Sequence, residues 1–501
     1  MNILASCHDK EGLAGFLSSF MKEGDTVYAT GNTQQYLLSK GINAKGTKEL
    51  SGFQELAGGR VKTLTPGVMA GILSPRDELS RKQLSDLHFP EFDMVICNLY
   101  PFAEAAKENN LESMIENIDI GGITLIRSAG KNYRYVTVVC DIADYQKVSR
   151  EITDSGTVSE STRRYLALKA FSTAADYDIL IYNALNRSLI GMESPRDLYL
   201  SYRNGKKLRY GENPDQSAWF YTDGTQRGIA NATQLNGKEL SYNNILDANS
   251  AYETVLEFDL KTTVIVKHLT PCGVSSANTL VDSYEKAFEA DPESAYGFVM
   301  ATNAKFDVPT ASAMSKHFAE IVIAPDYEPE ALKILKKKKN LRILKAVFER
   351  DAGNRIRSVS NGLLLQSPMT VMPASLEKKT TIAVDPKGME DLIFAWKVVA
   401  HARSNAIVLA KNLSTVGIGA GQTSRIRALK IAGEMAGANG KGSVLASDAF
   451  FPFSDSVEEA HRLGVSAIIQ PGGSIRDEEV IKRCEELQIP LYFTNKRTFL
   501  H

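Results

Sequence analysis

Short apolar runs alternate with longer amphipathic stretches along the N-terminal part of the chain. Apolar runs bounded by turn-forming residues predict buried strands, whereas apolar positions spaced three and four apart predict helices. The predicted strands lie at residues 2–6, 26–30, 93–98 and 135–141, and the predicted helices at 10–23, 33–40 and 159–186. Such strands suit a mostly parallel sheet that is covered on both faces, so the pattern predicts an α/β sandwich.

The same alternation continues after a polar stretch at residues 194–207, which is rich in Arg, Lys, Ser and Asn. We place a domain boundary near residue 195. Beyond it, the predicted strands lie at 263–267, 297–301, 320–323 and 406–411, with a turn at 268–273 and a helix at 385–402. A second boundary near residue 370 divides this part into two α/β halves. The predicted domains are therefore 1–195, 196–370 and 371–501.

The charge balance excludes several classes of partner. The chain of 501 residues has 58 Lys and Arg against 59 Asp and Glu, so no overall field attracts nucleic acid or an anionic membrane. No apolar run approaches the roughly 18 residues that span a bilayer, and the N-terminal segment lacks the basic region of a signal peptide. The four-lysine run 336–339 is expected to be a solvated helix end or loop.

Cysteine usage predicts the compartment. The five cysteines are far apart, odd in number and without a CxxC pair; they are Cys7, Cys97, Cys140, Cys272 and Cys484. This pattern indicates reduced thiols and argues against a disulfide framework or a thiolate zinc site. We therefore expect a cytoplasmic protein.

Two strand-to-helix turns in the N-terminal part carry hydroxyl groups. Ser6 to Lys10 follows the first predicted strand, and Thr30-Gly31-Asn32-Thr33 follows the second. Free backbone N–H groups and the positive end of the helix dipole bind phosphate at such turns. The alternative is that these residues only cap their helices.

Three further segments of this part carry candidate functional side chains near turn residues. Gly58-Gly59 precede Arg60 and Lys62 and would let backbone approach an anion. Asp119 and Lys131 are apolar-flanked charges near glycines, which suits either acid–base chemistry or a partly buried ion pair. Tyr100 follows a predicted strand, where it is either functional or a packed aromatic residue.

In the C-terminal part, Lys267 and His268 lie at the carboxyl end of a predicted strand. They would bring a cation and a base to the usual ligand crevice of an open α/β sheet, although a structural histidine is the alternative. The glycine-rich segment 417–425 departs from a dinucleotide fingerprint, because its third glycine comes one place early and no acidic residue follows about 20 positions on. We expect a glycine-rich turn there, with Arg425 as an anion contact.

Ten strings, in one order along nearly the whole chain, resemble the family of bifunctional purine-biosynthesis enzymes. This family combines aminoimidazole carboxamide ribonucleotide (AICAR) formyltransferase with inosine monophosphate (IMP) cyclohydrolase. The strings are GGRVKTL, NLYPF, ENIDIGG and AGKN in the first domain, then RYGENPDQ, VKHLTPCG, SNAIVLAKN, GIGAGQTSRI, SDAFFPF and QPGGSIRD.

The resemblance implies a fold, a co-substrate and an assembly. It implies a methylglyoxal-synthase-like, three-layer α/β domain with cyclohydrolase activity, followed by two cytidine-deaminase-like α/β halves that form the transformylase. The formyl donor would be 10-formyltetrahydrofolate, and the small-molecule substrates AICAR and formyl-AICAR, with no catalytic metal. The enzyme would be an intertwined homodimer with its transformylase sites at the subunit interface.

The resemblance also assigns residues. The implied catalytic residues are Lys267 and His268 in the transformylase, and Lys62, Tyr100, Asp119 and Lys131 in the cyclohydrolase. The implied substrate-binding residues are Ser6, Lys10, Thr30, Gly31, Thr33, Arg60 and Thr63 in the first domain, and Arg209, Tyr210, Gly297, Asn405, Arg425, Asp448, Phe450, Pro452 and Arg497 in the two transformylase halves. His268 would be the base and Lys267 the cation at the oxyanion.

Four positions depart from the family's pattern. His8 and Asn32 replace a hydroxyl residue and a glycine of the phosphate loops, and Thr65 and Asp215 each replace a histidine. Two other functions therefore stay open: a monofunctional transformylase whose first domain has lost activity, and a non-catalytic module that senses purine nucleotides.

Overall fold

The computed structural model describes residues 1–52, 56–57, 60–191, 196–225, 227–350 and 353–501. The chain divides into two compact units, Met1–Ser201 and Tyr202–His501. The predicted boundary near residue 195 lies beside this division, on a segment outside the described residues. No helix among the described residues is long and apolar enough to cross a membrane.

The first unit is built on a parallel sheet with the strand order β3-β2-β1-β4-β5 among the described residues. Its strands are β1 Asn2–Cys7, β2 Thr26–Ala29, β3 Ala44–Gly46, β4 Met94–Asn98 and β5 Thr137–Val139. The parallel sheet confirms the prediction, because β1 and β4 are nearly continuous buried apolar runs.

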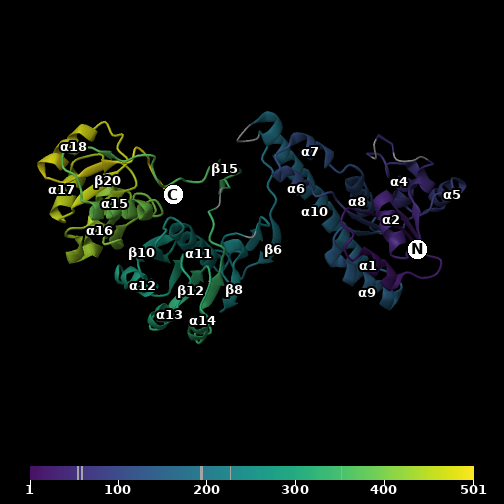
Figure 1. Ribbon diagram of the computed structural model, residues 1–501, viewed down its shortest axis with the longest axis horizontal. Coiled ribbons are helices and arrows are strands. Elements are labelled where there is room, and N and C mark those ends of the chain that lie inside the picture. Colours follow the sequence, from purple (N-terminus) through teal and green to yellow (C-terminus); the bar gives the residue numbers. More distant parts are fainter. Residues whose placement is uncertain (53–55, 58–59, 192–195, 226, 351–352) are drawn as a thin grey trace. The chain divides into compact units, whose positions relative to one another are not determined.

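Helices connect these strands (Figure 1). They are α1 Leu13–Phe20, α2 Gly31–Ser39, α3 Lys48–Ser51, α4 Pro66–Leu73, α5 Glu78–Asp86, α6 Phe102–Lys107, α7 Leu111–Glu116, α8 Gly121–Lys131, α9 Tyr145–Ser155 and α10 Glu160–Leu185. The helix predicted at 10–23 is too long. Gly12 adopts a left-handed conformation before α1, and Met21 is extended after it, so the helix is confined to the residues between them.

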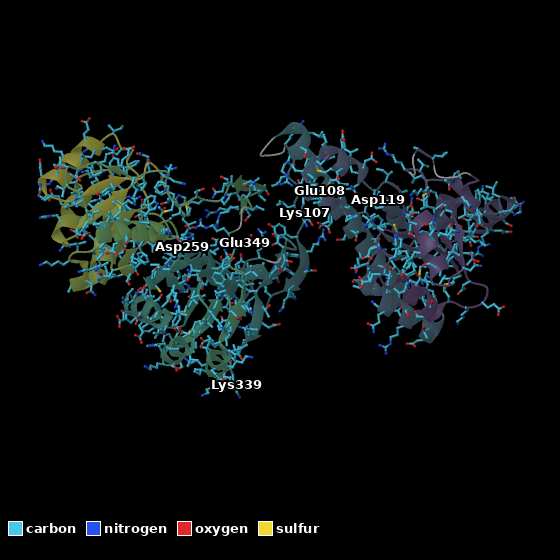
Figure 2. The ribbon with its side chains drawn as sticks, viewed as in Figure 1. Lys107, Glu108, Asp119, Asp259, Lys339 and Glu349 are labelled. Atoms are coloured by element: carbon cyan, nitrogen blue, oxygen red, sulfur yellow. The ribbon has the colours of Figure 1, made fainter. Side chains whose placement is uncertain are left out.

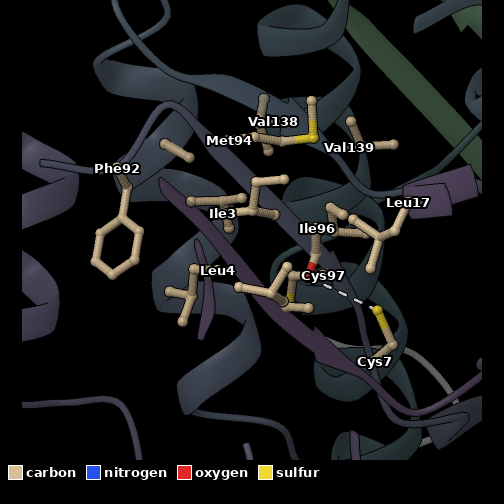
Figure 3. Close-up of a cluster of buried hydrophobic side chains, with 14 of the residues drawn as sticks. Ile3, Leu4, Cys7, Leu17, Phe92, Met94, Ile96, Cys97, Val138 and Val139 are labelled. Carbon is tan, nitrogen blue, oxygen red and sulfur yellow. Dashed lines mark hydrogen bonds between the residues drawn. The ribbon is translucent and has the colours of Figure 1, made fainter. Parts of the chain in front are cut away.

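The core of the first unit lies around β1 and β4. Ile3, Leu4, Met94 and Ile96 are buried there together with Leu17 of α1, as Figure 3 shows. Burying side chains of this size contributes about 1.5–3 kcal/mol each. This packing fixes the strands whose carboxyl ends carry the first group of candidate residues.

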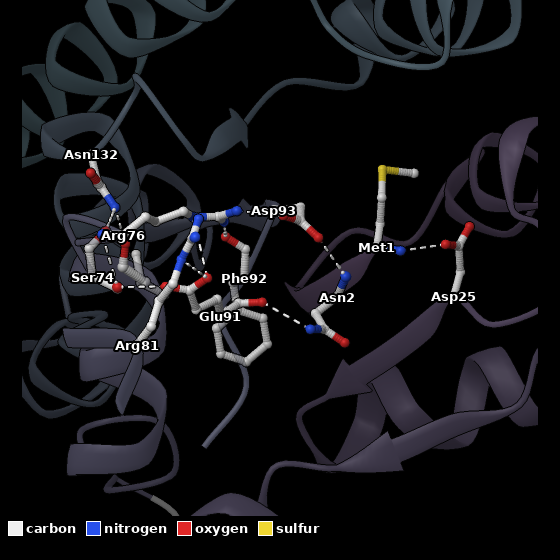
Figure 4. Close-up of polar contacts among 11 residues, drawn as sticks. Met1, Asn2, Asp25, Ser74, Arg76, Arg81, Glu91, Phe92, Asp93 and Asn132 are labelled. Carbon is white, nitrogen blue, oxygen red and sulfur yellow. Dashed lines mark hydrogen bonds and ion pairs between the residues drawn. The ribbon is translucent and has the colours of Figure 1, made fainter. Parts of the chain in front are cut away.

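Polar contacts stabilise the end of this sheet at which its strands begin (Figure 4). Asp93, before β4, accepts hydrogen bonds from Asn2 N–H at 2.8 Å and from Arg76 at 3.0 Å. Asn132, directly after α8, donates to the carbonyls of Ile72 and Ser74 at 2.7 and 2.8 Å. The carboxyl end of α8 is therefore held on this side of the unit.

The second unit contains one mixed sheet, whose order among the described residues is β16-β21-β20-β19-β17-β18-β10-β9-β11-β12-β13-β8. Its strands are β8 Thr233–Asn236, β9 Lys261–Lys267, β10 Thr270–Ala277, β11 Phe298–Thr302, β12 Ala319–Ala324, β13 Arg342–Lys345, β16 Glu377–Lys378, β17 Ile407–Lys411, β18 Ser414–Gly419, β19 Val444–Ser447, β20 Ala467–Gln470 and β21 Leu491–Phe493. Two small hairpins accompany it: β6 Arg203–Lys207 with β7 Trp219–Thr222, and β14 Arg355–Val359 with β15 Gly362–Gln366.

Helices cover both faces of this sheet. They are α11 Tyr242–Val255, α12 Leu280–Glu289, α13 Val308–Met314, α14 Pro329–Lys336, α15 Pro386–Val399, α16 Arg425–Ala436, α17 Asp455–Arg462 and α18 Asp477–Glu486. Along β9, Val264 and Val266 pack in the core shared with α11 and α15, whereas Ile265 packs on the opposite face with α12. The alternation gives three layers. At the end of α14, three of the four lysines 336–339 are exposed, as predicted for a solvated helix end. Figure 2 labels Lys339 at the periphery.

The sheet of the second unit contains an internal repeat that is not visible in the sequence. The order β10-β9-β11-β12-β13 in the first half matches β18-β17-β19-β20-β21 in the second, with the same strand directions. Gly273 and Gly417 occupy equivalent positions, and a Cβ on either would lie about 2 Å from a helix carbonyl, at 1.9 Å from Ala287 O and 2.0 Å from Ala432 O. Both halves need glycine there for the helix to approach the strand.

Candidate functional site

The first candidate group lies where β1 and β2 end. Thr30 precedes α2 and makes no capping hydrogen bond with its side chain, while its hydroxyl donates to Ser6 Oγ at 3.2 Å. Lys10 Nζ donates to the carbonyl of His8 at 2.9 Å, across the same turn. The predicted phosphate turns therefore meet, as the parallel order of β1 and β2 requires.

Thr33 has a different place from the one expected for a phosphate ligand. It is buried, and its hydroxyl accepts from Cys7 N–H at 3.1 Å and donates to Cys7 O at 3.2 Å. These bonds tie α2 to the end of β1. Thr33 thus supports the turn, and Gly31 provides the first N–H of the helix.

Asp119 is held at the start of α8 by backbone donors. Its Oδ1 accepts from Gly122 N–H at 2.6 Å, and the backbone of Tyr100 also bonds to the carboxylate. A Cβ on Gly122 would lie 2.5 Å from Asp119 Oδ2, so the glycine permits this approach. Burial raises the pKa of Asp119, and these donors oppose that rise only in part.

Two basic side chains lie near Asp119. His8 and Lys62 both interact electrostatically with its carboxylate. The Tyr100 ring lies edge-on to His8 at 5.5 Å and is 40% exposed, so Tyr100 is not a packed core aromatic. Gly121 lies beside Thr63, whose Oγ1 would be 3.1 Å from a Cβ on that glycine. Lys62, Tyr100 and Asp119 are therefore brought together.

Two other residues predicted for this site, Arg60 and Lys131, are exposed. Arg60 forms an exposed ion pair with Glu116, and Gly58-Gly59 lie outside the described residues. Lys131 is exposed at the carboxyl end of α8. It precedes Asn132, which donates to the carbonyls of Ile72 and Ser74. At a rise of 1.5 Å per residue Lys131 is about 15 Å along the helix from Gly121. Lys131 therefore forms no ion pair with Asp119 of the same chain.

The second candidate group begins at a tight hairpin. Lys267 pairs with Thr270, and the two residues between them, His268 and Leu269, both have positive φ, at 48° and 66°. The turn predicted at 268–273 is thus wrong beyond Leu269, because Thr270–Ala277 forms β10. Lys267 Nζ donates to Tyr296 O at 2.7 Å and lies 3.4 Å from Gly297 O.

Charged residues from three other elements lie near this hairpin. Asp247 of α11 interacts with Lys267 and His268, and also with Glu320 of β12. Burial lowers the pKa of Arg342, at the start of β13, while Glu320 raises it and Arg209 lowers it further. Arg209 also stacks over the Tyr210 ring at 4.8 Å. These interactions join the predicted Arg209 and Tyr210 to the Lys–His pair.

A pocket of about 480 Å³ forms the third candidate group. The predicted residues Asn405, Phe450, Pro452 and Arg497 line it, together with Arg425. Phe450 and Phe499 offer partly exposed rings, and Arg497 lies 4.6 Å from the Phe499 ring. The pocket thus combines aromatic faces with a cation, which suits a planar anionic ligand.

Arg425 lines this pocket and forms an ion pair with Asp448, which lies behind the lining residues. Asp448 is fully buried and accepts from Arg425 and from Ala406 N–H, the latter at 3.1 Å. Arg425 also donates to Asn405 Oδ1 at 2.6 Å. The guanidinium of Arg425, which was predicted as an anion contact, thus bonds to these protein groups and orients Asn405. Gly417 and Gly419 belong to β18 rather than to a turn.

The sheet brings the hairpin and the pocket to the same end. β9 ends there at Lys267, and β10 begins there. β18 runs antiparallel to β10 and so ends there at Gly419. β17 begins there, just after Asn405, and β19 ends there at Ser447, just before Asp448. All these residues belong to the second unit, and their place follows from strand direction alone.

Comparison with known proteins identifies the family. Residues 12–124 match the MGS-like domain and residues 129–435 the AICARFT/IMPCHase bienzyme. Bifunctional purine biosynthesis protein PurH from Ruminiclostridium cellulolyticum is 45% identical over 509 residues, covering 99% of both chains. The proteins of that name from Bacillus cytotoxicus and Caldicellulosiruptor saccharolyticus are also 45% identical, over 510 and 508 residues, with 99% of each chain covered.

The chain belongs to the AICARFT/IMPCHase bienzyme family. This confirms the predicted bifunctional enzyme, which has formyltransferase and IMP cyclohydrolase activities and acts in the last two steps of purine biosynthesis. It also confirms the methylglyoxal-synthase-like first domain and the α/β class. The two alternatives, a monofunctional transformylase and a nucleotide sensor, are not favoured.

Sequence reasoning missed Asp247, Glu320 and Arg342 of this bienzyme. They lie in a helix and two strands without glycine-rich turns, and only the fold brings them to the Lys–His pair. A polar residue at the amino end of an otherwise apolar strand was the available signal for Glu320 and Arg342. Asp215, one of the four positions that depart from the family's pattern, is exposed in the loop between β6 and β7.

Proposed function

We propose that the two activities of the chain reside in separate sites, one in each unit. The cyclohydrolase site comprises Lys62, Tyr100 and Asp119, with the phosphate of the nucleotide bound by Ser6, Lys10, Thr30 and the N-terminus of α2. The transformylase site comprises Lys267 and His268 with Arg209 and Tyr210, together with the pocket lined by Asn405, Phe450 and Arg497. The observation that carries this proposal is the clustering of the Lys–His pair and the pocket at one end of one sheet.

Formyl transfer needs a base, because the exocyclic amine of AICAR is a poor nucleophile. The amine attacks the formyl carbon of 10-formyltetrahydrofolate, and we assign the removal of its proton to His268. Lys267 supplies positive charge to the tetrahedral oxyanion or to the folate nitrogen that leaves. The folate ring would lie against the aromatic residues of the pocket, which supports this co-substrate.

Cyclisation of formyl-AICAR is intramolecular, so the substrate itself supplies most of the proximity. The carboxamide nitrogen attacks the formyl group, and water leaves. We assign the proton transfer from that nitrogen to Asp119, whose carboxylate is held by backbone donors, and the stabilisation of the departing oxygen to Lys62 and Tyr100. Lys131 is assigned no contact with Asp119 of its own chain.

We also propose a homodimer with the transformylase sites at the subunit interface, and a cytoplasmic location. The location is supported by the five cysteines, each of which is a free thiol. Sedimentation of the purified chain tests the dimer: a monomer at micromolar concentration, fully active in formyl transfer, contradicts it.

One experiment tests the assignment of the sites. Purified protein is incubated with AICAR and 10-formyltetrahydrofolate, and IMP and formyl-AICAR are measured. His268→Asn should reduce formyl transfer about 100-fold or more, because an amide cannot act as a base, while cyclisation of added formyl-AICAR stays intact. Asparagine tolerates the positive φ of this turn, so the fold is preserved. Loss of both activities would contradict separate sites.

A further inference from the structure

The hairpin that carries His268 has a second copy in the same unit. Lys411 pairs with Ser414, and the two residues between them, Asn412 and Leu413, both have a φ of 55°. Lys411 Nζ donates to Lys441 O at 3.0 Å, just before β19, as Lys267 Nζ donates to Tyr296 O just before β11. The two turns are therefore equivalent members of the internal repeat.

Each turn is held by an aspartate from the helix that precedes its hairpin. Asp247 Oδ1 accepts from Leu269 N–H at 2.8 Å. Asp391 accepts from Leu413 N–H at 2.6 Å and from Asn412 N–H at 2.9 Å. A non-glycine residue at positive φ costs free energy, so a fixed acceptor that engages the turn's backbone stabilises this conformation in both halves.

The two turns differ in chemistry. The residue at the first turn position is His268 in one and Asn412 in the other, and only the histidine can take up a proton. Asp247 is half-buried, and its carboxylate interacts with the charges of His268 and Lys267. Of the other charged groups there, Glu320 lies 3.9 Å from Arg342, which balances its charge.

We propose that Asp247 is a positioning residue for formyl transfer, which fixes the turn so that the His268 imidazole points at the amine and favours its imidazolium form once the proton has been taken up. The proposal rests on the assignment of His268 as the base. It extends that assignment to a helix residue outside all the recognised strings. Asp391 has only the structural part of this role, because its turn carries no base.

The matched variants Asp247→Asn and Asp391→Asn test the proposal in the full-length enzyme. An asparagine at 247 keeps an oxygen that can accept from Leu269 N–H and removes only the charge, so the turn is preserved. We measure kcat and KM for AICAR across pH in the formyl transfer reaction, with thermal unfolding and cyclisation of added formyl-AICAR as controls.

For Asp247→Asn we expect kcat of formyl transfer to fall about tenfold or more, because the imidazolium formed in the reaction loses a nearby negative charge, with KM for AICAR changed little. The acid limb of the kcat profile should move to lower pH, because the protonated imidazole loses a nearby negative charge. The pH at the midpoint of this acid limb does not depend on the amount of folded enzyme. Asp391→Asn should leave both the limb and kcat as in the wild type, whatever it does to thermal stability.

An unmoved acid limb with wild-type kcat in Asp247→Asn overturns the proposal, and so does an equal change in Asp391→Asn. The result for His268→Asn separates this from failure of the site assignment. If His268→Asn is inactive and Asp247→Asn is normal, only the role of Asp247 fails. If His268→Asn still transfers formyl groups at the wild-type rate, the assignment of the base fails and the role of Asp247 with it.

Discussion

The Tyr177 hydroxyl accepts a hydrogen bond from the backbone N–H of Asp119 at 2.8 Å, and it donates to Asn117 O at 3.0 Å. Tyr177 belongs to the long helix α10, and its ring packs edge-on against Phe102 at 6.2 Å. A buried residue far along the chain thus sets the backbone of the loop that presents the Asp119 carboxylate. Asp119 is fixed from both sides, by Tyr177 on its N–H and by Gly122 on its carboxylate.

Tyr177→Phe should therefore slow cyclisation, although Tyr177 is not one of the residues assigned to bind or convert the substrate. Removal of the hydroxyl leaves the N–H of Asp119 and the carbonyl of Asn117 without their partner, which costs about 1–3 kcal/mol. We expect kcat for added formyl-AICAR to fall about three- to thirtyfold, with formyl transfer unchanged. Tyr182→Phe, which removes the hydroxyl of a partly buried tyrosine further along α10, is the control. Equal cyclisation rates in both variants would contradict a role for this contact.

In the pH dependence of the cyclisation rate, the fall in rate at low pH, its acid limb, should reflect protonation of Asp119. Burial raises its pKa above the ordinary value of 3.8. A base is lost on protonation, so the rate should fall as the pH drops through this raised pKa. Asp119→Asn should remove the limb and lower kcat about 100- to 10,000-fold. A rate that instead rises as the pH falls through this range would show that Asp119 acts as the acid.

Strand prediction succeeded where side chains are apolar and failed where buried hydroxyl groups pair. The runs around Ile3, Ile96 and Val264 predict their strands directly. β10 was not predicted as a strand: its first four residues were placed in the turn 268–273, and the rest was assigned no element. It contains Ser275 and Ser276, which are buried and bond across the sheet to Ser414 and Thr262 at 2.6 and 2.7 Å. A hydroxyl group satisfied within a sheet has the same letter as one exposed in a loop, so the sequence pattern cannot separate them.

The candidate sites divide in a similar way. Residues in turns that follow strands, such as Thr30 and His268, could be placed from the sequence because parallel and hairpin strands bring their ends together. Asp247 could not, because its contact with Leu269 depends on how α11 packs on the sheet. Nor could the sequence show that Lys131 lies far from Asp119. The stretch between them begins with Gly121 and Gly122, which do not indicate a helix, so the helix α8 that separates the two residues was not predicted.

Gly273 and Gly417 should be intolerant of any side chain. A Cβ would lie 1.9 Å from Ala287 O or 2.0 Å from Ala432 O, and backbone cannot yield as a flexible side chain does. We expect Gly273→Ala and Gly417→Ala each to destabilise the second unit by about 3 kcal/mol. In Gly15→Ala, where the Cβ meets nothing within 4 Å in α1, helix propensity should instead stabilise the first unit by up to about 1 kcal/mol. Calorimetry of the three variants checks the signs, and an unchanged melting profile for Gly273→Ala would contradict the close approach.

Lys169 of α10 joins two carboxylates, and its removal should cost stability that depends on pH. Its Nζ lies 2.7 Å from Asp141 and 2.6 Å from Asp144, of which Asp144 is buried. The hydrogen bond from Lys169 holds the pKa of Asp141 below the ordinary value of 3.8. Lys169→Met should destabilise the first unit by about 1–2 kcal/mol at pH 7, less than for a fully buried pair because Lys169 and Asp141 are partly exposed to screening solvent.

The sign of the pH dependence follows from the depressed pKa of Asp141. In the unfolded chain this group titrates near 3.8 and in the folded protein below that value, so the stabilisation is complete well above pH 3.8 and is lost as the pH falls through the folded pKa. The difference between wild type and Lys169→Met in urea unfolding, followed by circular dichroism, should therefore be full at pH 7 and should narrow below about pH 5. Arg164→Met removes an exposed pair with Glu160 on the same helix and should change stability by at most about 0.5 kcal/mol. A difference for Lys169→Met that stays constant down to pH 4, or one no larger than that of Arg164→Met, would show that the two carboxylates do not depend on this lysine.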